Sequence, residues 1–510
     1  MTAEHKIEDV TMLHKQNDLA DGNRGLHYEE NLLWEKERSD EPGVDLPKPA
    51  GAKLRTGLSE RGDIGLPQVS EPQVVRHFVR LSTLNYSIDS GFFPLGSCTM
   101  KHNPRLNEKV ARYAGFAHAH PLQPAKTVQG SLRVMYELQN WLGELTGLPG
   151  VCLSPAAGAH GELAGMMTIA RAHEAKGNTH KRVVLVPDSA HGTNPATAAI
   201  CGFTIKVIPT KETGRLTVDA FKEALGDGHD VAGMMVTNPN TCGLFETDIL
   251  EISKLLHDAG GYFYCDGANF NALVGKIRPG DFGVDVMHIN LHKTFSTPHG
   301  GGGPGSGPIC VTEELAPFMP VPVVGKDGDD YKLLYEDDRP ETLGRLRGFV
   351  GQFGMHVRAL SYMMSHGADG LKQVSEDAVL NANYLLSQLK DVFHVPYEGP
   401  CMHECLLTDK KQKEKGVETI DIAKALTEYG YHPMTVYFPL VLPGTMLIEP
   451  TETESIDALD RFVTTMKTIA SDVEKGDTEK YHNFPISTPR RRLDEVKAAR
   501  QPVLRWKDAS

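Results

Sequence analysis

The sequence contains no long hydrophobic run and no basic stripe. No stretch approaches the ~18 uninterrupted apolar residues of a membrane helix, and Met1 to Leu19 is too polar to act as a secretory signal. The formal net charge of −13 is distributed along the chain, whereas a nucleic-acid surface needs clustered lysine and arginine. We therefore expect a cytoplasmic protein that binds neither a membrane nor a polynucleotide.

Cysteines are few and scattered, without the dense spacing of a disulfide-stapled secreted domain. Cys401 and Cys405 have a spacing that fits no zinc pattern, and they lie in an apolar, strand-like run. The sequence therefore predicts free buried thiols and no metal site. The eight cysteines are Cys98, Cys152, Cys201, Cys242, Cys265, Cys310, Cys401 and Cys405.

The chain is long enough for two folded domains. Its 510 residues exceed the ~250–300 residues at which a single core stops growing, and 40% hydrophobic with 23% charged residues is an ordinary globular composition. Residues 1–75 are rich in charge, glycine and proline and predict an arm that contacts another subunit. Residues 76–345 are expected to form a large ligand-binding domain, and residues 346–510 a smaller C-terminal domain with a tail.

Helical segments alternate with short β-rich runs between about residues 123 and 315. This alternation predicts an α/β domain with a mainly parallel sheet, and the region after residue 349 predicts a smaller α+β domain. The expected strands of the larger domain are Arg182–Val186, Thr204–Ile208, Gly233–Val236, Tyr262–Tyr264 and Val286–Ile289. The expected helices include Leu163–Glu174, Ile249–Ala259, Ala378–Lys390 and Ser455–Ala470, and the smaller domain adds strands Met402–Leu407 and Pro433–Val436.

Small residues lead from the first strand-like run into a helix. Gly158 and Ala159 lie in this segment, Ser154 to Glu162. Free backbone N–H groups at the positive end of a helix can hold a phosphate. A tight turn that needs glycine only for its backbone freedom explains the same residues. Ligands of open α/β sheets bind at the carboxyl ends of strands, so the segment is a candidate phosphate loop.

Two further strand ends carry polar residues that suit a planar ring. His191 follows the strand Arg182–Val186, and its imidazole can either stack on a ring or hydrogen-bond its own loop. Thr237 and Asn238 follow the strand Gly233–Val236 and offer a hydroxyl and an amide to a phenolic oxygen. An ordinary Asn-Pro turn is the competing explanation.

The next two strand ends carry opposite charges. Asp266 ends an apolar strand, where an unpaired carboxylate is costly, so it needs a positive partner such as a protonated pyridine nitrogen. Lys293 follows the next strand, and an amine held neutral among apolar walls is what Schiff-base formation requires. Taken singly, Lys293 is more often a solvated lysine. Taken together with the other strand ends, Asp266 and Lys293 predict a site for pyridoxal phosphate (PLP).

These residues stand in longer motifs that resemble one known family. The run Asn290 to Phe295, the glycine-rich segment Pro298 to Gly305, and the motifs Asp266 to Asn269 and Ser189 to Pro195 are similar to the glycine decarboxylase (P-protein) family of the glycine cleavage system. The resemblance spans nearly the whole chain after the first ~30 residues. Further matching motifs are Asn85–Asp89, Pro94–Lys101, Pro443–Glu454, Arg492–Glu495 and Pro502–Trp506.

The resemblance implies a fold-type I PLP-dependent transferase-like large domain, with the cofactor joined to Lys293 as a Schiff base. Asp266 would contact the pyridinium nitrogen, and His191 would stack on the ring. The other implied cofactor contacts are Ala268 beneath the ring, Gly158 and Ala159 at the phosphate, and Thr237, Asn238 and His292. Where this fold type often has serine or threonine before the lysine, the chain has Asn290 and His292, so the phosphate ligands on that side stay open.

The family occurs as one long chain or as two subunits, and this lysine-bearing chain resembles subunit 2. The resemblance implies a partner subunit 1, a heterotetramer of two such pairs, and a lipoyl-carrying H-protein. Glycine would replace Lys293 on the cofactor, lose its carboxylate as carbon dioxide, and pass its aminomethyl group to the oxidised lipoyl arm. The segments Asn85–Lys101 and His118–Pro121 are candidates for lining the glycine pocket, with an ordinary helix–loop role as the alternative.

Two other functions agree with part of the pattern. Another fold-type I PLP enzyme, such as an aminotransferase or a cysteine desulfurase, would carry a substrate arginine or a mobile catalytic cysteine. A non-catalytic assembly subunit would have lost the lysine, which this chain retains.

Overall fold

A computed structural model describes residues 30–36, 43, 47, 65–210, 212–300 and 303–505. The chain divides into two units, one formed by Met1–Ser90 with Glu479–Ser510 and the other by Gly91–Thr478. The described part of the first unit contains η2 (Leu33–Glu35), α2 (Glu71–Leu84), α15 (Glu479–Asn483) and α16 (Glu495–Arg500).

Some sequence predictions fall beyond the described residues. Most of the predicted arm, residues 1–75, lies outside them, as do residues 301 and 302 of the glycine-rich segment and Trp506. The domain boundaries at residues 75 and 345 stay predictions.

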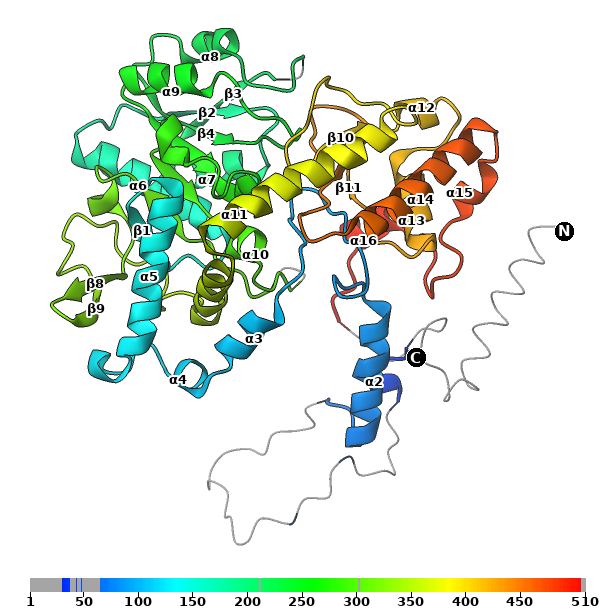
Figure 1. The fold of residues 1–510 in the computed structure, drawn as a ribbon, viewed down its shortest axis with the longest axis horizontal. Coiled ribbons are helices and arrows are strands. Elements are labelled where there is room, and N and C mark those ends of the chain that lie inside the picture. Colours follow the sequence, from blue (N-terminus) through cyan, green and yellow to red (C-terminus); the bar gives the residue numbers. More distant parts are fainter. Residues whose placement is uncertain are drawn as a thin grey trace. The chain divides into compact units, whose positions relative to one another are not determined.

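Seven strands form the main sheet of the unit Gly91–Thr478 (Figure 1). Their order is β1-β7-β6-β5-β4-β2-β3, with β7 antiparallel to both neighbours and the remaining pairs parallel. All five predicted strands are present. The strands are β1 (Gly150–Cys152), β2 (Val183–Pro187), β3 (Thr204–Ile208), β4 (Val231–Thr237), β5 (Tyr262–Asp266), β6 (Val286–His288) and β7 (Ile309–Val311).

Helices cover both faces of the main sheet because successive strand residues are apolar on both sides. The helices are α5 (Gln129–Thr146), α6 (Gly158–Ala175), α7 (Thr193–Ile200), α8 (Val218–Leu225), α9 (Ile249–Asp258) and α11 (Phe353–Leu389). Leu185 and Cys265 share a core with α5, α8, α9 and α11. Their strand neighbours Val184 and Tyr264 share a core with α6 and α7 on the other face. This layered arrangement confirms the predicted α/β class.

Shorter elements connect these layers within the same unit. They are α3 (Arg105–Ala111), α4 (Ala114–Ala117), η3 (Ala125–Thr127), η4 (Gly267–Ala272), η5 (Pro279–Phe282), α10 (Leu291–Thr294), η6 (Ala316–Phe318) and the hairpin of β8 (Val323–Asp327) with β9 (Asp330–Leu334).

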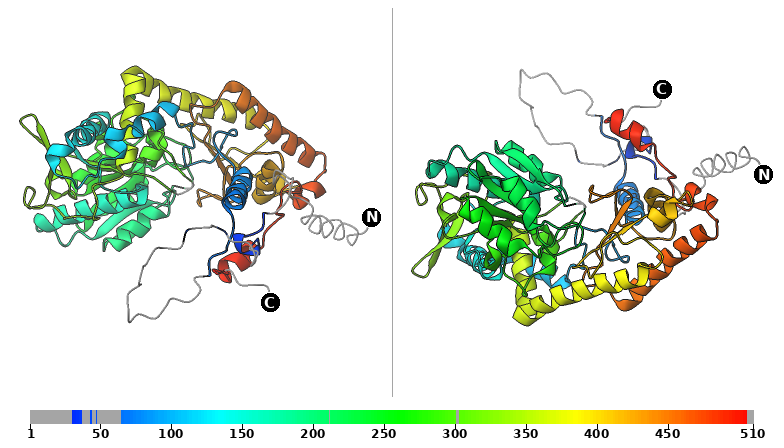
Figure 2. Two further views of the ribbon diagram at one scale, coloured as in Figure 1. Left: turned by 90° about the horizontal axis from the view of Figure 1, so that it is seen from below. Right: turned by 90° about the horizontal axis from the view of Figure 1, so that it is seen from above.

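A second, three-stranded antiparallel sheet follows α11, in the order β10-β12-β11. The long helix α11 contacts α5 beside the main sheet and α14 beside the small one, as the views of Figure 2 show in yellow. It bends at Gly367, whose φ of +62° is unfavourable for other residues. The elements of this region are β10 (Cys405–Thr408), α12 (Lys410–Lys413), α13 (Thr419–Glu428), β11 (Thr435–Val436), β12 (Thr445–Ile448) and α14 (Ile456–Glu474).

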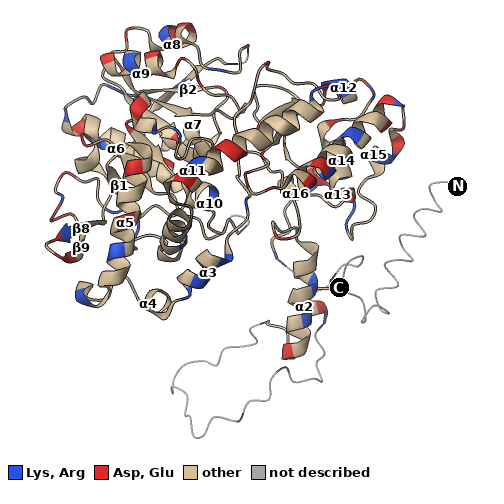
Figure 3. Cartoon of the chain, viewed as in Figure 1, with Lys and Arg blue, Asp and Glu red and all other residues tan. Residues whose placement is uncertain are grey.

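Charges of both signs are interspersed on the helices of the described chain (Figure 3). Among the described residues, no helix is both long and apolar enough to cross a membrane.

Candidate cofactor site

Four strand ends meet at one edge of the main sheet. Strands β2, β4, β5 and β6 are successive parallel neighbours, so their carboxyl ends lie side by side. Thr237, the last residue of β4, pairs with Asp266, the last residue of β5. Lys293 lies just beyond the end of β6, in α10. The fold therefore brings the predicted polar residues to one rim.

Asp266 is nearly fully buried, with 3% of its surface exposed. Its carboxylate accepts hydrogen bonds from Asn194 Nδ2 at 3.0 Å and from the Ala268 backbone N–H at 2.9 Å, and His288 Nε2 lies 3.5 Å away. Burial alone would raise the pKa of Asp266, but His288, these two hydrogen bonds and the positive charge of Lys293 hold it below its ordinary value. The rim thus presents a buried carboxylate that remains ionised.

Glu162 is a second buried acid, which the sequence analysis missed. Asn194 Nδ2 also donates to Glu162 Oε1 at 3.1 Å, and the hydroxyls of Thr193 and Thr197 donate to the Glu162 carboxyl at 2.8 and 3.2 Å. Burial and the neighbouring charge of Asp266 raise the pKa of Glu162 to about 8. The group is therefore mostly neutral at pH 7. An acid one turn into a helix of small and apolar residues was the available sequence signal.

Glu162, Asp266 and His288 place possible metal-ligand atoms within 4.8 Å of one another. His288 is already engaged with the Tyr264 hydroxyl at 2.6 Å and with Asn290 Oδ1 at 2.8 Å. The neutral Glu162 and these hydrogen bonds favour a polar network over a metal site.

Lys293 is half-buried, and its Nζ donates a hydrogen bond to the backbone carbonyl of Ser97 at 2.7 Å. Ser97 belongs to the segment Asn85–Lys101, which the sequence suggested as a pocket lining. Burial lowers the pKa of the nearby His292 imidazole to about 3, and the charge of Lys293 lowers it further. Lys293 thus lies near the ionised Asp266 and a neutral His292.

The predicted phosphate loop is the N-terminus of α6. The N-cap residue Ala157 makes no side-chain cap, so the first N–H groups of the helix are available to a ligand. A Cβ atom on Gly158 would lie 2.4 Å from Asn290 Nδ2, so a larger residue would displace the Asn290 amide from the helix end that it approaches. Of the two residues left open by the sequence, Asn290 therefore faces this loop, where Ala159 is exposed.

His292 faces the glycine-rich segment instead. Its Nδ1 accepts a hydrogen bond from the Ser306 N–H at 3.4 Å, and its ring centroid lies 5.3 Å from that of His299. A Cβ atom on Gly305 would lie 2.9 Å from His292 Nδ1. Glycine at this position allows the backbone to pass close to the imidazole.

Two polar atoms at the end of β4 are suited to a bound molecule. Thr237 Oγ1 and Asn238 Nδ2 are buried, and neither has a hydrogen-bond partner among the described residues. Buried polar atoms are normally hydrogen-bonded, so a ligand with acceptor and donor atoms fits here. The other amide atom, Asn238 Oδ1, accepts from the Glu246 N–H at 3.0 Å and fixes the side chain.

His191 is exposed and makes the loop hydrogen bond that was one of its two interpretations. Its Nδ1 accepts from the Thr193 N–H at 3.2 Å, and its ring lies edge-on to Phe438 with centroids 5.5 Å apart. The ring-stacking role stays a prediction.

The segment His118–Pro121 was the second candidate for lining the glycine pocket. Here the ring of His120 packs edge-on against Phe349, with centroids 5.8 Å apart.

The cysteine prediction is confirmed in that all eight are free thiols. Six of them are buried, whereas Cys98 and Cys201 are half-buried.

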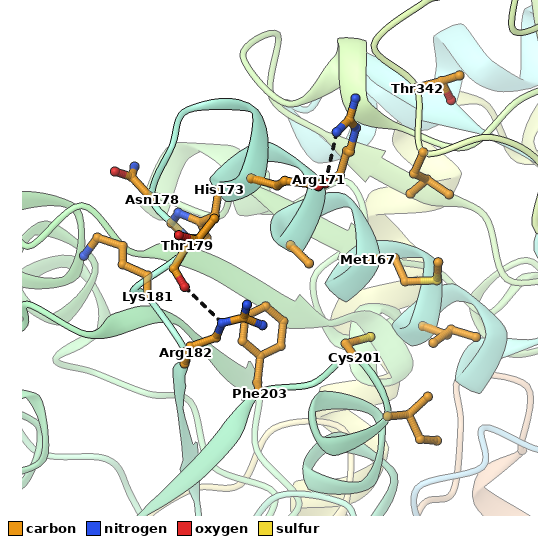
Figure 4. A pocket seen from close by; sticks show the side chains of 15 residues that line it. Met167, Arg171, His173, Asn178, Thr179, Lys181, Arg182, Cys201, Phe203 and Thr342 are labelled. Carbon is orange, nitrogen blue, oxygen red and sulfur yellow. Dashed lines mark hydrogen bonds and ion pairs between the residues drawn. The ribbon is translucent and has the colours of Figure 1, made fainter.

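A surface hollow of about 890 Å³ contains none of the predicted site residues. Figure 4 shows Arg171 and His173 of α6 above it and Cys201 and Phe203 near β3 below. The strand-end site is therefore identified by its buried charges and unpaired polar atoms, and not by the presence of this hollow.

Known families match most of the chain. The family described as "Glycine cleavage system P-protein" matches residues 49–333. The family described as "Glycine dehydrogenase, C-terminal domain" matches residues 374–489.

Individual proteins are similar over nearly the full length. The chain is 56% identical over 503 residues to the "Probable glycine dehydrogenase (decarboxylating) subunit 2" of Caulobacter vibrioides, covering 96% of both chains. It is 53% identical over 487 residues to the protein of the same name from Halalkalibacterium halodurans, covering 94% of this chain and 99% of that protein. A crystal structure of glycine decarboxylase (P-protein) in inhibitor-bound form has a TM-score of 0.66 at 21% identity, covering 84% of this chain and 92% of the other, and shares its fold.

Proposed function

Because this chain belongs to the family of glycine cleavage system P-proteins, we propose that it is the lysine-bearing subunit of a PLP-dependent glycine decarboxylase. Its products would be carbon dioxide and an aminomethyl group carried on the lipoyl arm of an H-protein. One observation carries the proposal: Asp266 ends β5 and Lys293 follows the adjacent strand β6, near enough for the positive charge of Lys293 to lower the pKa of Asp266. A PLP site needs an amine and a carboxylate on opposite sides of the ring.

The buried groups fit this cofactor. When bound, PLP supplies a ring that takes up the electron pair left when glycine loses its carboxylate. Lys293 would hold the cofactor covalently, and the ionised Asp266 would keep a ring nitrogen protonated. The unpaired Thr237 Oγ1 and Asn238 Nδ2 would reach a phenolic oxygen. These four side chains would fix the plane and the electronic state of the ring.

The remaining contacts would orient the cofactor. Gly158 and Ala159 would present backbone N–H groups to its phosphate, with the Asn290 amide alongside. His191 and Ala268 would cover the two faces of the ring, which excludes water from the reacting carbon. Neutral Glu162 would support Asp266 through the shared Asn194 amide without adding a second negative charge, and His292 would adjoin the lysine.

The relatives named subunit 2 support a partner. We infer a subunit 1, a heterotetramer of two pairs, and a lipoyl-carrying H-protein as the acceptor, with glycine as the substrate. The candidate arm, residues 1–75, would supply subunit contacts.

Replacing the lysine tests the proposal. Lys293→Ala should abolish the borohydride-reducible PLP chromophore, because no other amine follows the end of β6 beside Asp266 in the described chain. The exposed residue Lys254 provides the control, and Lys254→Ala should keep the wild-type absorbance spectrum. A Lys293→Ala protein that still yields a reduced PLP adduct would refute the assignment.

The reaction itself is measured with the presumed partners. Glycine-dependent exchange of labelled bicarbonate, in the presence of subunit 1 and the lipoyl carrier, is the expected activity. Turnover of cysteine would instead support a desulfurase, and transfer of an amino group to a 2-oxo acid an aminotransferase. A colourless protein after loading with PLP would favour a non-catalytic assembly subunit.

A further inference from the structure

A second pair of buried acids lies near Lys293, on the side of the small sheet. Glu404 precedes β10 and Glu449 follows β12, and both have 0% of their surface exposed. These two strands pair antiparallel, with Cys405 opposite Ile448, so the acids emerge at the same end of the small sheet. The charge of Lys293 acts on both carboxyls.

The two acids hold one strained turn. Glu404 Oε2 accepts the Ser97 N–H at 2.8 Å, and Glu449 Oε2 accepts the Thr99 N–H at 2.9 Å. Glu449 Oε1 is also 2.5 Å from the Thr99 hydroxyl. Ser97 and Thr99 have φ values of +64° and +44°, a left-handed backbone that residues with a Cβ rarely adopt. Glu404 and Glu449 thereby fix the direction of the Ser97 carbonyl, which accepts a hydrogen bond from the Lys293 amine.

Only one of the two acids can carry a charge at neutral pH. Burial and the neighbouring Glu449 raise the pKa of Glu404 well above its ordinary value, whereas burial raises the pKa of Glu449 to about 7. His403, whose Nε2 lies 3.8 Å from Glu449 Oε1, does not supply a balancing cation, because burial lowers its pKa to about 3. At neutral pH the pair therefore carries at most one negative charge, which lies on Glu449 and develops as pH rises through about 7.

The other ionisable groups near the Lys293 amine do not neutralise the negative charge of Glu449. Burial lowers the pKa of His292, His299 and His403 and raises the pKa of the Cys98 thiol, so these groups are neutral. Asp266 is the other anion, and the proposed function commits it to the cofactor. Among the described residues, Lys293 shifts the pKa of Cys98, His191, Asp266, His288, His292, His299, His403, Glu404 and Glu449.

We propose that the Glu404–Glu449 pair, acting through the Ser97–Thr99 turn, holds Lys293 as an ammonium ion while glycine occupies its place on the cofactor. This inference rests on the proposed function, and both acids are positioning residues. The Ser97 carbonyl fixes the released amine, and the charge on Glu449 compensates the ammonium.

The exchange balances without any further reactant. Glycine would enter as an ammonium ion and would replace Lys293 Nζ on the cofactor, one bond to nitrogen being exchanged for another. The protons that leave the glycine nitrogen would pass to Lys293 Nζ, which would become an ammonium ion. The Glu404–Glu449 pair offers this ion a buried countercharge in place of water.

Glu449→Gln tests the inference with little change of shape. The glutamine oxygen can still accept the Thr99 N–H, and its amide can donate to the Thr99 hydroxyl, but the charge is gone. The PLP-loaded chain with subunit 1 is mixed rapidly with glycine, and the change in its visible spectrum is followed. The maximal rate should fall about ten- to a hundredfold, because one hydrogen-bonded charge interaction is lost. The glycine concentration giving half-maximal rate and the starting spectrum should stay as in the wild type.

Two further variants make the outcome decisive. Glu404→Gln, which keeps an acceptor for the Ser97 N–H, should slow the exchange less, because Glu404 is the protonated member of the pair. Glu454→Gln is the matched control, because burial alone raises the pKa of Glu454 to about 7 and Lys293 does not act on it. Wild-type exchange rates in Glu449→Gln would overturn the inference. A wild-type protein without the chromophore would instead overturn the proposed function, so the two failures are distinguishable.

Discussion

At the residue scale, Asn194 explains how two buried acids coexist behind the cofactor site. Its single amide nitrogen donates to both Glu162 and Asp266. One acid can stay ionised only if the other keeps its proton, because two adjacent carboxylates in a buried site repel each other. Accordingly, the pKa of Glu162 is raised and that of Asp266 is lowered.

The raised pKa of Glu162 predicts a pH-dependent stability. An acid whose folded pKa, about 8, exceeds its ordinary value of 4.5 stabilises the fold at low pH, and this stabilisation is lost as pH rises through about 8. The loss amounts to at most roughly 5 kcal/mol. Glu162→Gln keeps acceptor and donor atoms for Thr197 and Asn194 but cannot ionise.

The urea midpoint of the cofactor-free protein measures this effect between about pH 5 and about pH 9. The midpoint of Glu162→Gln should fall less over this range than that of the wild type. The exposed Glu474 gives the control, and Glu474→Gln should follow the wild type. Parallel curves for wild type and Glu162→Gln would contradict the shift.

At the scale of elements, the strand ends could be predicted because each of these functional residues lies at the end of its own strand or a few residues after it. Asp266 and Lys293 were placed from the apolar runs before them, and both lie at the rim. The Ser97–Thr99 turn could not be placed this way. Its two hydrogen-bonding acids lie 307 and 350 positions away in the sequence, and only the pairing of β10 with β12 brings them together. The pattern of residues within a short stretch of sequence cannot reveal contacts between such distant positions.

A substitution at the N-terminus of α6 tests the candidate phosphate loop. Gly158→Ala places a Cβ where Asn290 Nδ2 would be 2.4 Å away, so the amide or the helix end must shift. Overpacking of this kind costs about 1–3 kcal/mol, and PLP affinity should fall about tenfold or more. Gly130→Ala in α5 meets no atom within 4 Å and serves as the control. Equal PLP dissociation constants for Gly158→Ala and the wild type, measured by absorbance titration, would argue against the phosphate loop.

At the scale of the whole molecule, every proposed cofactor contact comes from the unit Gly91–Thr478. The main sheet supplies the strand ends and the small sheet supplies the acids that fix the Ser97–Thr99 turn. The pattern of helical and strand-like segments predicted both the main sheet and the small sheet. It could not show that the position of Lys293 would depend on residues from both. A site assembled within one unit should need no partner to bind its cofactor.

The chain alone should therefore form the PLP chromophore, whereas decarboxylation should require subunit 1 and the lipoyl carrier. The absorbance spectrum of the purified chain loaded with PLP tests the first part, with Lys293→Ala as the blank. Adding subunit 1 should start glycine-dependent bicarbonate exchange while leaving the yield of chromophore unchanged. A chromophore that appears only after subunit 1 is added would mean that the partner completes the cofactor site, and the contacts within Gly91–Thr478 would then be insufficient to hold the ring.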